Sequence, residues 1–118
     1  MKRITNAFAK AKSENRGAFV AYLTMGFPNL AASEQAVDDV IADGADIVEL
    51  GVPFSDPFAD GGVIRSAAYE ALRQGVTLDS VIAAAKRIRV RHPETAFVLF
   101  SYYNLIFSKG LDSFADAI

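Results

Sequence analysis

The sequence contains no cysteine and no tryptophan, and it has one histidine among its 118 residues. The lack of cysteine excludes disulfide frameworks, thiol nucleophiles and cysteine-ligated zinc or iron–sulfur sites. A single histidine also excludes a metal site that is built from several histidines. We therefore expect no metal site in this protein.

The sequence also lacks a large charge imbalance and a long hydrophobic run. Its 12 basic and 14 acidic residues give a net charge of -2, which leaves no electrostatic footprint for nucleic acid or anionic lipid. No signal region begins the sequence and no stretch approaches the length of a membrane span, so we expect a cytoplasmic protein without membrane or nucleic-acid partners. A hydrophobic content of 52% with 22% charged residues is typical of a globular chain. Residues 1–118 are expected to form a single unit.

Hydrophobic patterns predict an alternation of strands and helices. Compact apolar runs predict strands at 18–24, 46–50 and 97–101. The connections between them are long enough for helical crossovers, which predicts an α/β fold with a parallel sheet. The dinucleotide fingerprint and the phosphate-loop motif are both absent, which favours a (β/α) barrel over a doubly wound sheet. Helical spacing predicts helices at 4–12, 30–43, 64–73, 77–92 and 110–118.

The most informative residue is Glu49, which lies in the apolar run that predicts the second strand. Functional groups of parallel α/β folds lie at the carboxyl ends of strands. If the strand is covered on both faces, an ionised carboxylate there is costly to desolvate. Glu49 is therefore either a general acid/base whose pKa is raised by apolar surroundings, or a structural carboxylate that pairs with a basic residue or faces water.

The loop after this strand contains two further aspartates. Asp56 precedes Pro57 and Asp60 precedes Gly61, and aspartates in such positions often only form turns. The loop is long for a strand-to-helix connection, however, and long loops at this end of a sheet often carry active-site residues. Both interpretations of the two aspartates remain open on this pattern.

The segment Glu49-Leu-Gly-Val-Pro-Phe-Ser-Asp-Pro-Phe-Ala-Asp-Gly61 resembles the signature of the tryptophan synthase alpha subunit, a family of single (β/α)8 barrels. The resemblance implies a lyase of tryptophan biosynthesis that needs no cofactor and cleaves indole-3-glycerol phosphate into indole and glyceraldehyde 3-phosphate. It extends along the chain through Thr24 with Gly26-x-Pro28, Gly44-Ala-Asp46, Gly75-Val-Thr77, Tyr102-x-Asn104 and Lys109-Gly110.

The resemblance also implies roles for individual residues. Glu49 resembles the catalytic acid/base, which takes the glycerol hydroxyl proton and serves protonation of the indole ring carbon. Asp60 resembles the carboxylate that stabilises positive charge on the ring nitrogen. Tyr22 and Tyr102 resemble the aromatic residues of the indole pocket, although for each taken alone a core position is the favoured interpretation.

The family works with a beta subunit that uses pyridoxal phosphate, and the loop from Pro53 to Asp60 resembles the segment that touches this partner. Pro53 and Asp56 are the implied interface residues. The family usually has proline and glutamine where this chain has Gly62 and Arg65. Glycine loosens a helix start, and a nearby arginine is expected to lower carboxylate pKa values.

A complete (β/α)8 barrel needs roughly 250 residues, so we expect a barrel truncated to about its first three strands. A three-stranded parallel sheet that is left open exposes backbone edges and apolar surface, and we therefore expect the chain to self-associate. No glycine-rich phosphate cradle occurs in the sequence. The alternatives are an active lyase completed by association, a noncatalytic barrel fragment that self-associates, and another barrel enzyme acting on phosphorylated sugars.

Overall fold

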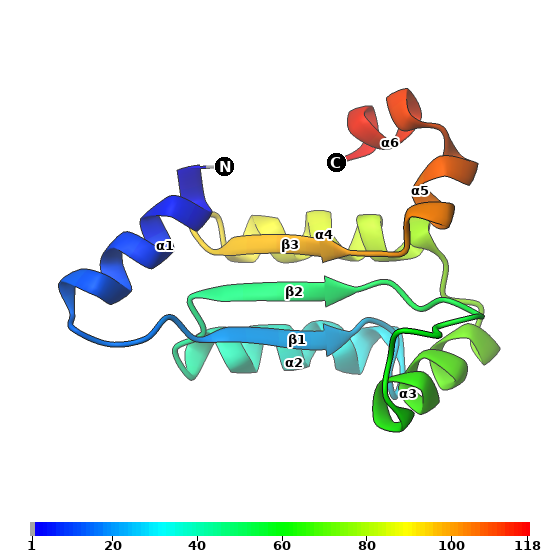
Figure 1. The fold of residues 1–118 in the computed structure, drawn as a ribbon, viewed down its shortest axis with the longest axis horizontal. Coiled ribbons are helices and arrows are strands. Elements are labelled where there is room, and N and C mark those ends of the chain that lie inside the picture. The colour runs from blue at the N-terminus through cyan, green and yellow to red at the C-terminus, as the bar shows by residue number, and fades with distance from the viewer. Residues whose placement is uncertain (1) are drawn as a thin grey trace.

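A computed structural model describes residues 2–118 of the protein, in which helices and strands alternate along the chain (Figure 1). The strand boundaries lie within one or two residues of those predicted from the apolar runs. The elements are α1 (Lys2–Ser13), β1 (Val20–Thr24), α2 (Leu30–Ala42), β2 (Ile47–Gly51), α3 (Gly62–Arg73), α4 (Leu78–Arg91), β3 (Ala96–Phe100), α5 (Tyr103–Lys109) and α6 (Leu111–Ala117).

The three strands form one parallel sheet in the order β1-β2-β3. Each strand therefore pairs with its neighbour in the sequence, and the connections between them are the crossovers that contain α2 and α3–α4. All three arrows in Figure 1 point the same way, and α3 and α5 lie at the end to which they point. The predicted parallel sheet is confirmed, and its carboxyl edge gathers the β2–α3 and β3–α5 connections.

One face of the sheet is packed against α2 and α4, which lie behind it in Figure 1. Alternate strand residues point toward these helices because side chains alternate between the two faces of a strand. The opposite face carries the register row of Tyr22, Glu49 and Val98, and all three are half-buried. The core on the helical side includes Ala21, Met25, Val37, Val48, Leu50, Val81, Ala84 and Ile88.

Local sequence signals explain where the long helices begin and end. Asn29 caps α2 by accepting a hydrogen bond from the Ala32 amide at 2.9 Å. Thr77 and Ser80 form a capping box at the start of α4, and this helix ends at Arg91, two residues before Pro93. None of the helices within residues 2–118 combines the length and the apolar character needed to cross a membrane.

The β1–α2 connection is held against the α3–α4 junction through a glycine. Gly26 has a φ of +93°, and a Cβ at this position would collide with the side chains of Val76 and Ala71. Its amide donates a hydrogen bond of 2.9 Å to the buried hydroxyl of Ser33. This loop needs glycine both for the positive φ and for the close approach.

The helix α5 is not predicted by the sequence pattern, which indicates only a strand-end loop before a helix at 110–118. Its seven residues are fewer than an isolated helix needs to be stable in water. Tertiary contacts stabilise it instead, because Leu105 packs against the core and Lys109 forms an ion pair with Asp79 at 2.5 Å. The predicted final helix is present as α6.

An ion pair between Arg16 and Asp46 links the segment before β1 to the residue before β2. The guanidinium donates to both carboxylate oxygens at 2.6 and 2.7 Å, and the Phe19 amide adds a third hydrogen bond at 2.8 Å. The hydrogen bonds from Arg16, followed by the one from Phe19, hold the pKa of Asp46 far below its ordinary value. The ionised form of Asp46 therefore stabilises the folded chain.

We expect the stability of the chain to fall in acid because of this carboxylate. The folded pKa of Asp46 is depressed, so its contribution is complete above the unfolded value of about 3.9 and is lost as the pH falls below it. Asp46→Asn should lower stability at pH 7 and flatten its decline in acid. Urea unfolding between pH 3 and 7 at one protein concentration measures both effects. Asp116→Asn, at an exposed position in α6, is the control, and parallel pH curves for D46N and the parent chain would contradict the expectation.

Candidate functional site

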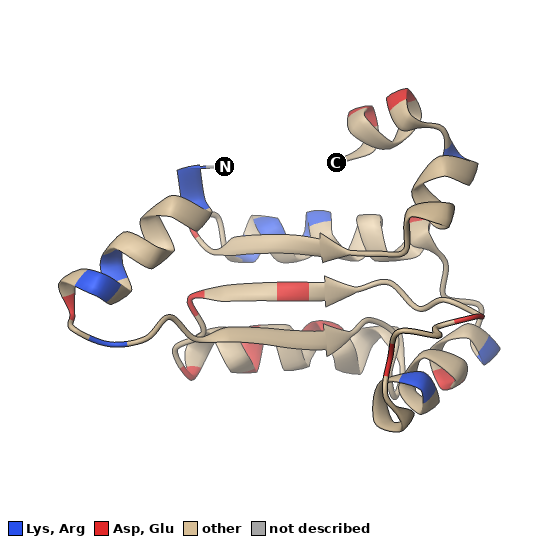
Figure 2. Ribbon diagram, viewed as in Figure 1, with Lys and Arg blue, Asp and Glu red and all other residues tan. Residues whose placement is uncertain are grey.

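Glu49 lies at the middle of the central strand, on the sheet face that the helices α2 and α4 do not cover. It is the acidic residue in β2, the strand that carries red in Figure 2. Its neighbours Val48 and Leu50 are buried on the helical side, whereas the side chain of Glu49 is half-buried. Among residues 2–118 no basic side chain forms an ion pair with it.

This placement bears on two points that the sequence left open, the cover of the strand and the pairing of Glu49 with a basic residue. The strand is not covered on both faces within the described residues, so the carboxylate of Glu49 avoids the full cost of burial. Within residues 2–118 no lysine or arginine forms an ion pair with Glu49, which argues against the interpretation of Glu49 as a structural carboxylate held by a basic residue. On this open face a bound molecule could reach the carboxylate of Glu49.

Tyr22 of β1 lies beside Glu49 on the same face. The two residues are register partners, and the Tyr22 ring leans along the sheet to lie over Gly51, where a Cβ would collide with it. The ring meets that of Phe100 edge-on, with centroids 5.7 Å apart and planes at 87°. Aromatic pairs favour this geometry. Tyr22 thus forms an aromatic wall next to the carboxylate.

The pKa of Tyr22 is raised above its ordinary value, chiefly because burial disfavours the phenolate. A hydrogen bond with Thr24 opposes the shift, and the negative charges of Asp60 and Glu49 add to it. The Tyr22 hydroxyl therefore lies in the electrostatic field of both carboxylates. It stays protonated at neutral pH and is available as a hydrogen-bond donor.

Asp60 is held at the same end of the sheet by Tyr102, the residue that precedes α5. The Tyr102 hydroxyl donates a hydrogen bond of 3.2 Å to the Asp60 carboxylate and accepts one of 3.2 Å from the Ala59 amide. The Tyr102 ring also contacts Phe54 and Phe58, with centroid distances of 4.8 and 5.7 Å. One side chain after β3 thus fixes the β2–α3 loop and the orientation of its last carboxylate.

The β2–α3 loop carries both Asp56 and Asp60. It contains the turns expected from its composition, because the Phe58 amide donates to the Asp56 carbonyl and the Asp60 amide to the Pro57 carbonyl. The Asp60 side chain is meanwhile turned toward Tyr102. Pro53 is buried, whereas Asp56 is exposed.

The two positions that depart from the family pattern lie at the start of α3. Gly62 is the first residue of this helix, so the helix begins here without proline. Arg65 lies on the exposed surface, and among residues 2–118 it forms no ion pair with Glu49 or Asp60.

Comparison with known proteins decides the family. A family model described as the tryptophan synthase alpha chain matches residues 8–118. The chain belongs to the tryptophan synthase alpha chain family. The tryptophan synthase alpha chain of Zymomonas mobilis is 46% identical over 115 residues, which are 98% of this chain and 42% of the relative. That of Shewanella amazonensis is 44% identical over 114 residues, which are 97% of this chain and 43% of the relative.

Solved structures show the same likeness in three dimensions. Tryptophan synthase subunit alpha from Legionella pneumophila aligns with a TM-score of 0.93 and 34% identity, over 98% of this chain and 44% of that one. Tryptophan synthase from Mycobacterium tuberculosis in an aminoacrylate-bound form aligns with a TM-score of 0.91 and 36% identity, over 98% and 46%. The chain thus spans less than half the length of these relatives. Its three parallel strands and their helices correspond to part of the family's (β/α)8 barrel, which confirms the predicted fold class.

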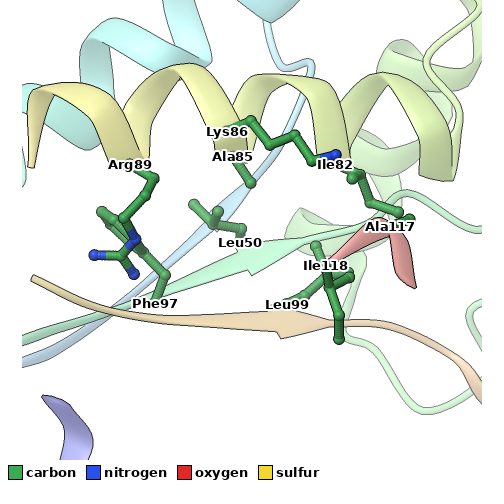
Figure 3. Close-up of a pocket in the computed structure, with 9 residues that line it drawn as sticks. All are labelled: Leu50, Ile82, Ala85, Lys86, Arg89, Phe97, Leu99, Ala117 and Ile118. Atoms are coloured by element: carbon green, nitrogen blue, oxygen red, sulfur yellow. The ribbon is translucent and has the colours of Figure 1, made fainter. Parts of the chain in front are cut away.

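A cavity beside the sheet is separate from this site. A cavity of about 350 Å³ lies on the helical face between α4 and β3, where Lys86 and Arg89 are its charged lining residues (Figure 3). Leu50 lines it, and Glu49, the preceding residue, points to the other face of the sheet. The cavity therefore belongs to the helical layer of this tryptophan synthase alpha-family chain.

Sequence reasoning missed two residues that shape the site, Gly51 and Phe100. Both lie on the face of Glu49, because Gly51 follows it by two positions and Phe100 is the register partner of Gly51. The signal that finds them is the two-residue period of a strand, applied from Glu49 once the strand register is known. Within residues 2–118 no group of three acidic, histidine or cysteine side chains is arranged to hold a metal ion.

Proposed function

We propose that this chain carries the acid/base chemistry of a tryptophan synthase alpha-type lyase, which cleaves indole-3-glycerol phosphate into indole and glyceraldehyde 3-phosphate. One observation supports the proposal above all. Within residues 2–118 Glu49 forms no ion pair with a basic side chain on the open face, and Asp60 is brought to the same end of the sheet by Tyr102. The proposal gives each of the two carboxylates a separate role in the reaction.

The reaction breaks the bond between indole carbon C3 and the adjacent hydroxyl-bearing carbon of the glycerol chain. A proton must reach C3, and the hydroxyl must lose its proton as its carbon becomes an aldehyde. Glu49 gives the first proton and takes the second, so its protonation state is restored after each turnover. Protonation of C3 places positive charge on the ring nitrogen, and Asp60 stabilises that charge.

The aromatic residues of the site supply the walls for a flat substrate ring. Tyr22 lies on β1 beside Glu49, whereas Tyr102 lies after the end of β3, directly before α5, and both are half-buried. Aromatic rings bind a planar ring such as indole through offset or edge contacts. The described residues contain no glycine-rich cradle, and we propose that residues beyond this set bind the phosphate group.

The β2–α3 loop is the proposed contact with a beta subunit. Asp56 is exposed and Phe58 is 82% exposed, so this part of the loop presents both charge and apolar surface. Pro53 is buried, and its contribution to such an interface would be to shape the loop. A cytoplasmic location is part of the same proposal, because a phosphorylated substrate does not cross a membrane unaided.

We also propose that the 118-residue chain self-associates in isolation. The outer edges of β1 and β3 have no strand neighbour within residues 2–118, and unpaired edges promote pairing with other chains. On the open face, Val20 is 43% and Phe100 is 47% exposed. Sedimentation velocity over a range of concentrations should show dimers or larger species. A compact monomer at all concentrations would contradict this expectation.

The test of the proposed function is release of indole from indole-3-glycerol phosphate by the purified chain. Release that requires Glu49 would support the lyase. A defined oligomer that releases no indole and binds no indole would favour the alternative, a noncatalytic barrel fragment.

A further inference from the structure

We propose that Gly51 is a positioning residue whose missing side chain seats the Tyr22 ring over β2 and so sets the aromatic wall beside Glu49. The role of this wall in binding a substrate ring rests on the proposed lyase function. The seating of Tyr22 by Gly51 does not, because it follows from the packing of the open face alone.

The first support for this proposal is the register of the sheet. Gly51 lies between Thr24 of β1 and Phe100 of β3 in one row across the three strands. Tyr22 lies two register positions earlier, opposite Glu49, and its ring reaches the Gly51 row diagonally. Diagonal neighbours in a sheet are within reach of an aromatic side chain.

The second support is steric. A Cβ at Gly51 would collide with the hydroxyl, Cζ and Cε2 of Tyr22, and these are the three heavy atoms nearest to it. The backbone of Gly51 forms part of β2 and its φ is not in the left-handed region, so the strand itself accepts alanine. The position therefore needs glycine because of the Tyr22 ring and not because of the backbone.

The third support is what the seating does to neighbouring groups. From its place over Gly51 the Tyr22 ring meets Phe100 edge-on at 5.7 Å. Its hydroxyl lies where Thr24 hydrogen-bonds to it and where Glu49, Asp60 and Tyr102 influence it. A displaced ring would lose both the contact with Phe100 and this position.

The experiment compares Gly51→Ala with Gly17→Ala, whose position has open space around it and lies at the other end of the sheet. NMR measures the nuclear Overhauser contacts between the Tyr22 and Phe100 rings. We expect G51A to lose these contacts while the amide shifts of the core residues Val48 and Leu50 remain close to those of the parent. G17A should keep the contacts. A folded G51A chain with unchanged ring contacts would overturn the proposal.

A double substitution covers the case in which G51A folds poorly. In a Tyr22→Ala background the alanine at position 51 has no ring to displace, so it should cost much less stability than in the parent chain. Equal losses in the two backgrounds would show that Gly51 serves the backbone and would overturn the proposal.

Binding of free indole then separates this proposal from the proposed function. If the parent chain binds indole, G51A should weaken its affinity roughly two- to tenfold, the range that one aromatic contact accounts for. Unchanged indole affinity in G51A would contradict the role of Tyr22 as a wall. Lost ring contacts in G51A, together with no indole binding by the parent, would support the seating and count against the lyase function.

Discussion

Glu49→Gln is expected to reduce indole release by the chain about 10²- to 10⁴-fold, which corresponds to roughly 3 to 5 kcal/mol in the activation barrier. Glutamine keeps the size of the side chain but can neither give nor take the proton that the reaction moves. Glu49 is half-buried and forms no ion pair within residues 2–118, so the substitution should leave the fold and its stability close to those of the parent. The measurement is the initial rate of indole release at saturating substrate.

The matched control for E49Q is Gln35→Glu, which places the reverse change on the exposed surface of α2. Q35E should retain the parent rate. Indole release by E49Q at the parent rate would remove Glu49 from the chemistry. Denaturant unfolding of both variants would show whether a lower rate reflects lost chemistry or a lost fold.

Asp60→Asn is expected to reduce indole release as well, but by less than E49Q. It removes the charge that would stabilise the cationic ring nitrogen and keeps a polar side chain that can still accept a hydrogen bond from Tyr102. We expect a loss of about 10²- to 10³-fold, the size seen when one electrostatic partner of a transition state is removed. Because the loss arises in the transition state, kcat should fall with little change in KM.

Tyr102→Phe tests the Asp60 carboxylate by removing the hydroxyl that donates a hydrogen bond to it. Phenylalanine keeps the ring contacts with Phe54 and Phe58 but no longer donates to Asp60 or accepts from Ala59. Y102F should reduce the rate less than D60N and should speed hydrogen exchange at the Ala59 amide.

A larger defect in D60N than in E49Q would overturn the assigned roles of the two carboxylates.

These rate measurements also decide between the functions proposed for the isolated chain. The chain spans less than half the length of its tryptophan synthase alpha relatives, yet it holds both of the carboxylates that the proposed reaction uses. Indole release that falls in E49Q and D60N would show that association completes a working site. No release by the parent would leave these residues as the family's chemical pair in a noncatalytic fragment.

Much of the architecture could be predicted from the sequence, because it depends on local patterns. The apolar runs around Ala21, Val48 and Leu99 predict three strands, and their long connections predict a parallel sheet. Thr77 and Pro93 mark the ends of α4 through capping and the restriction that proline imposes on the preceding residue. Helix α5 escaped prediction because its short length makes it depend on the tertiary contacts of Leu105 and Lys109.

The sequence by itself determined that the side chain of Glu49 points to the other face of the strand from those of Val48 and Leu50, since side chains alternate with a period of two. Only the tertiary structure decided which face of the sheet is open, and that no basic side chain among residues 2–118 pairs with Glu49 there. It also decided that Tyr102 reaches Asp60 across 42 residues of chain, and that Tyr22 lies over Gly51. Such contacts depend on strand register and loop conformation, which arise when distant segments pack together and leave no local signal in the sequence.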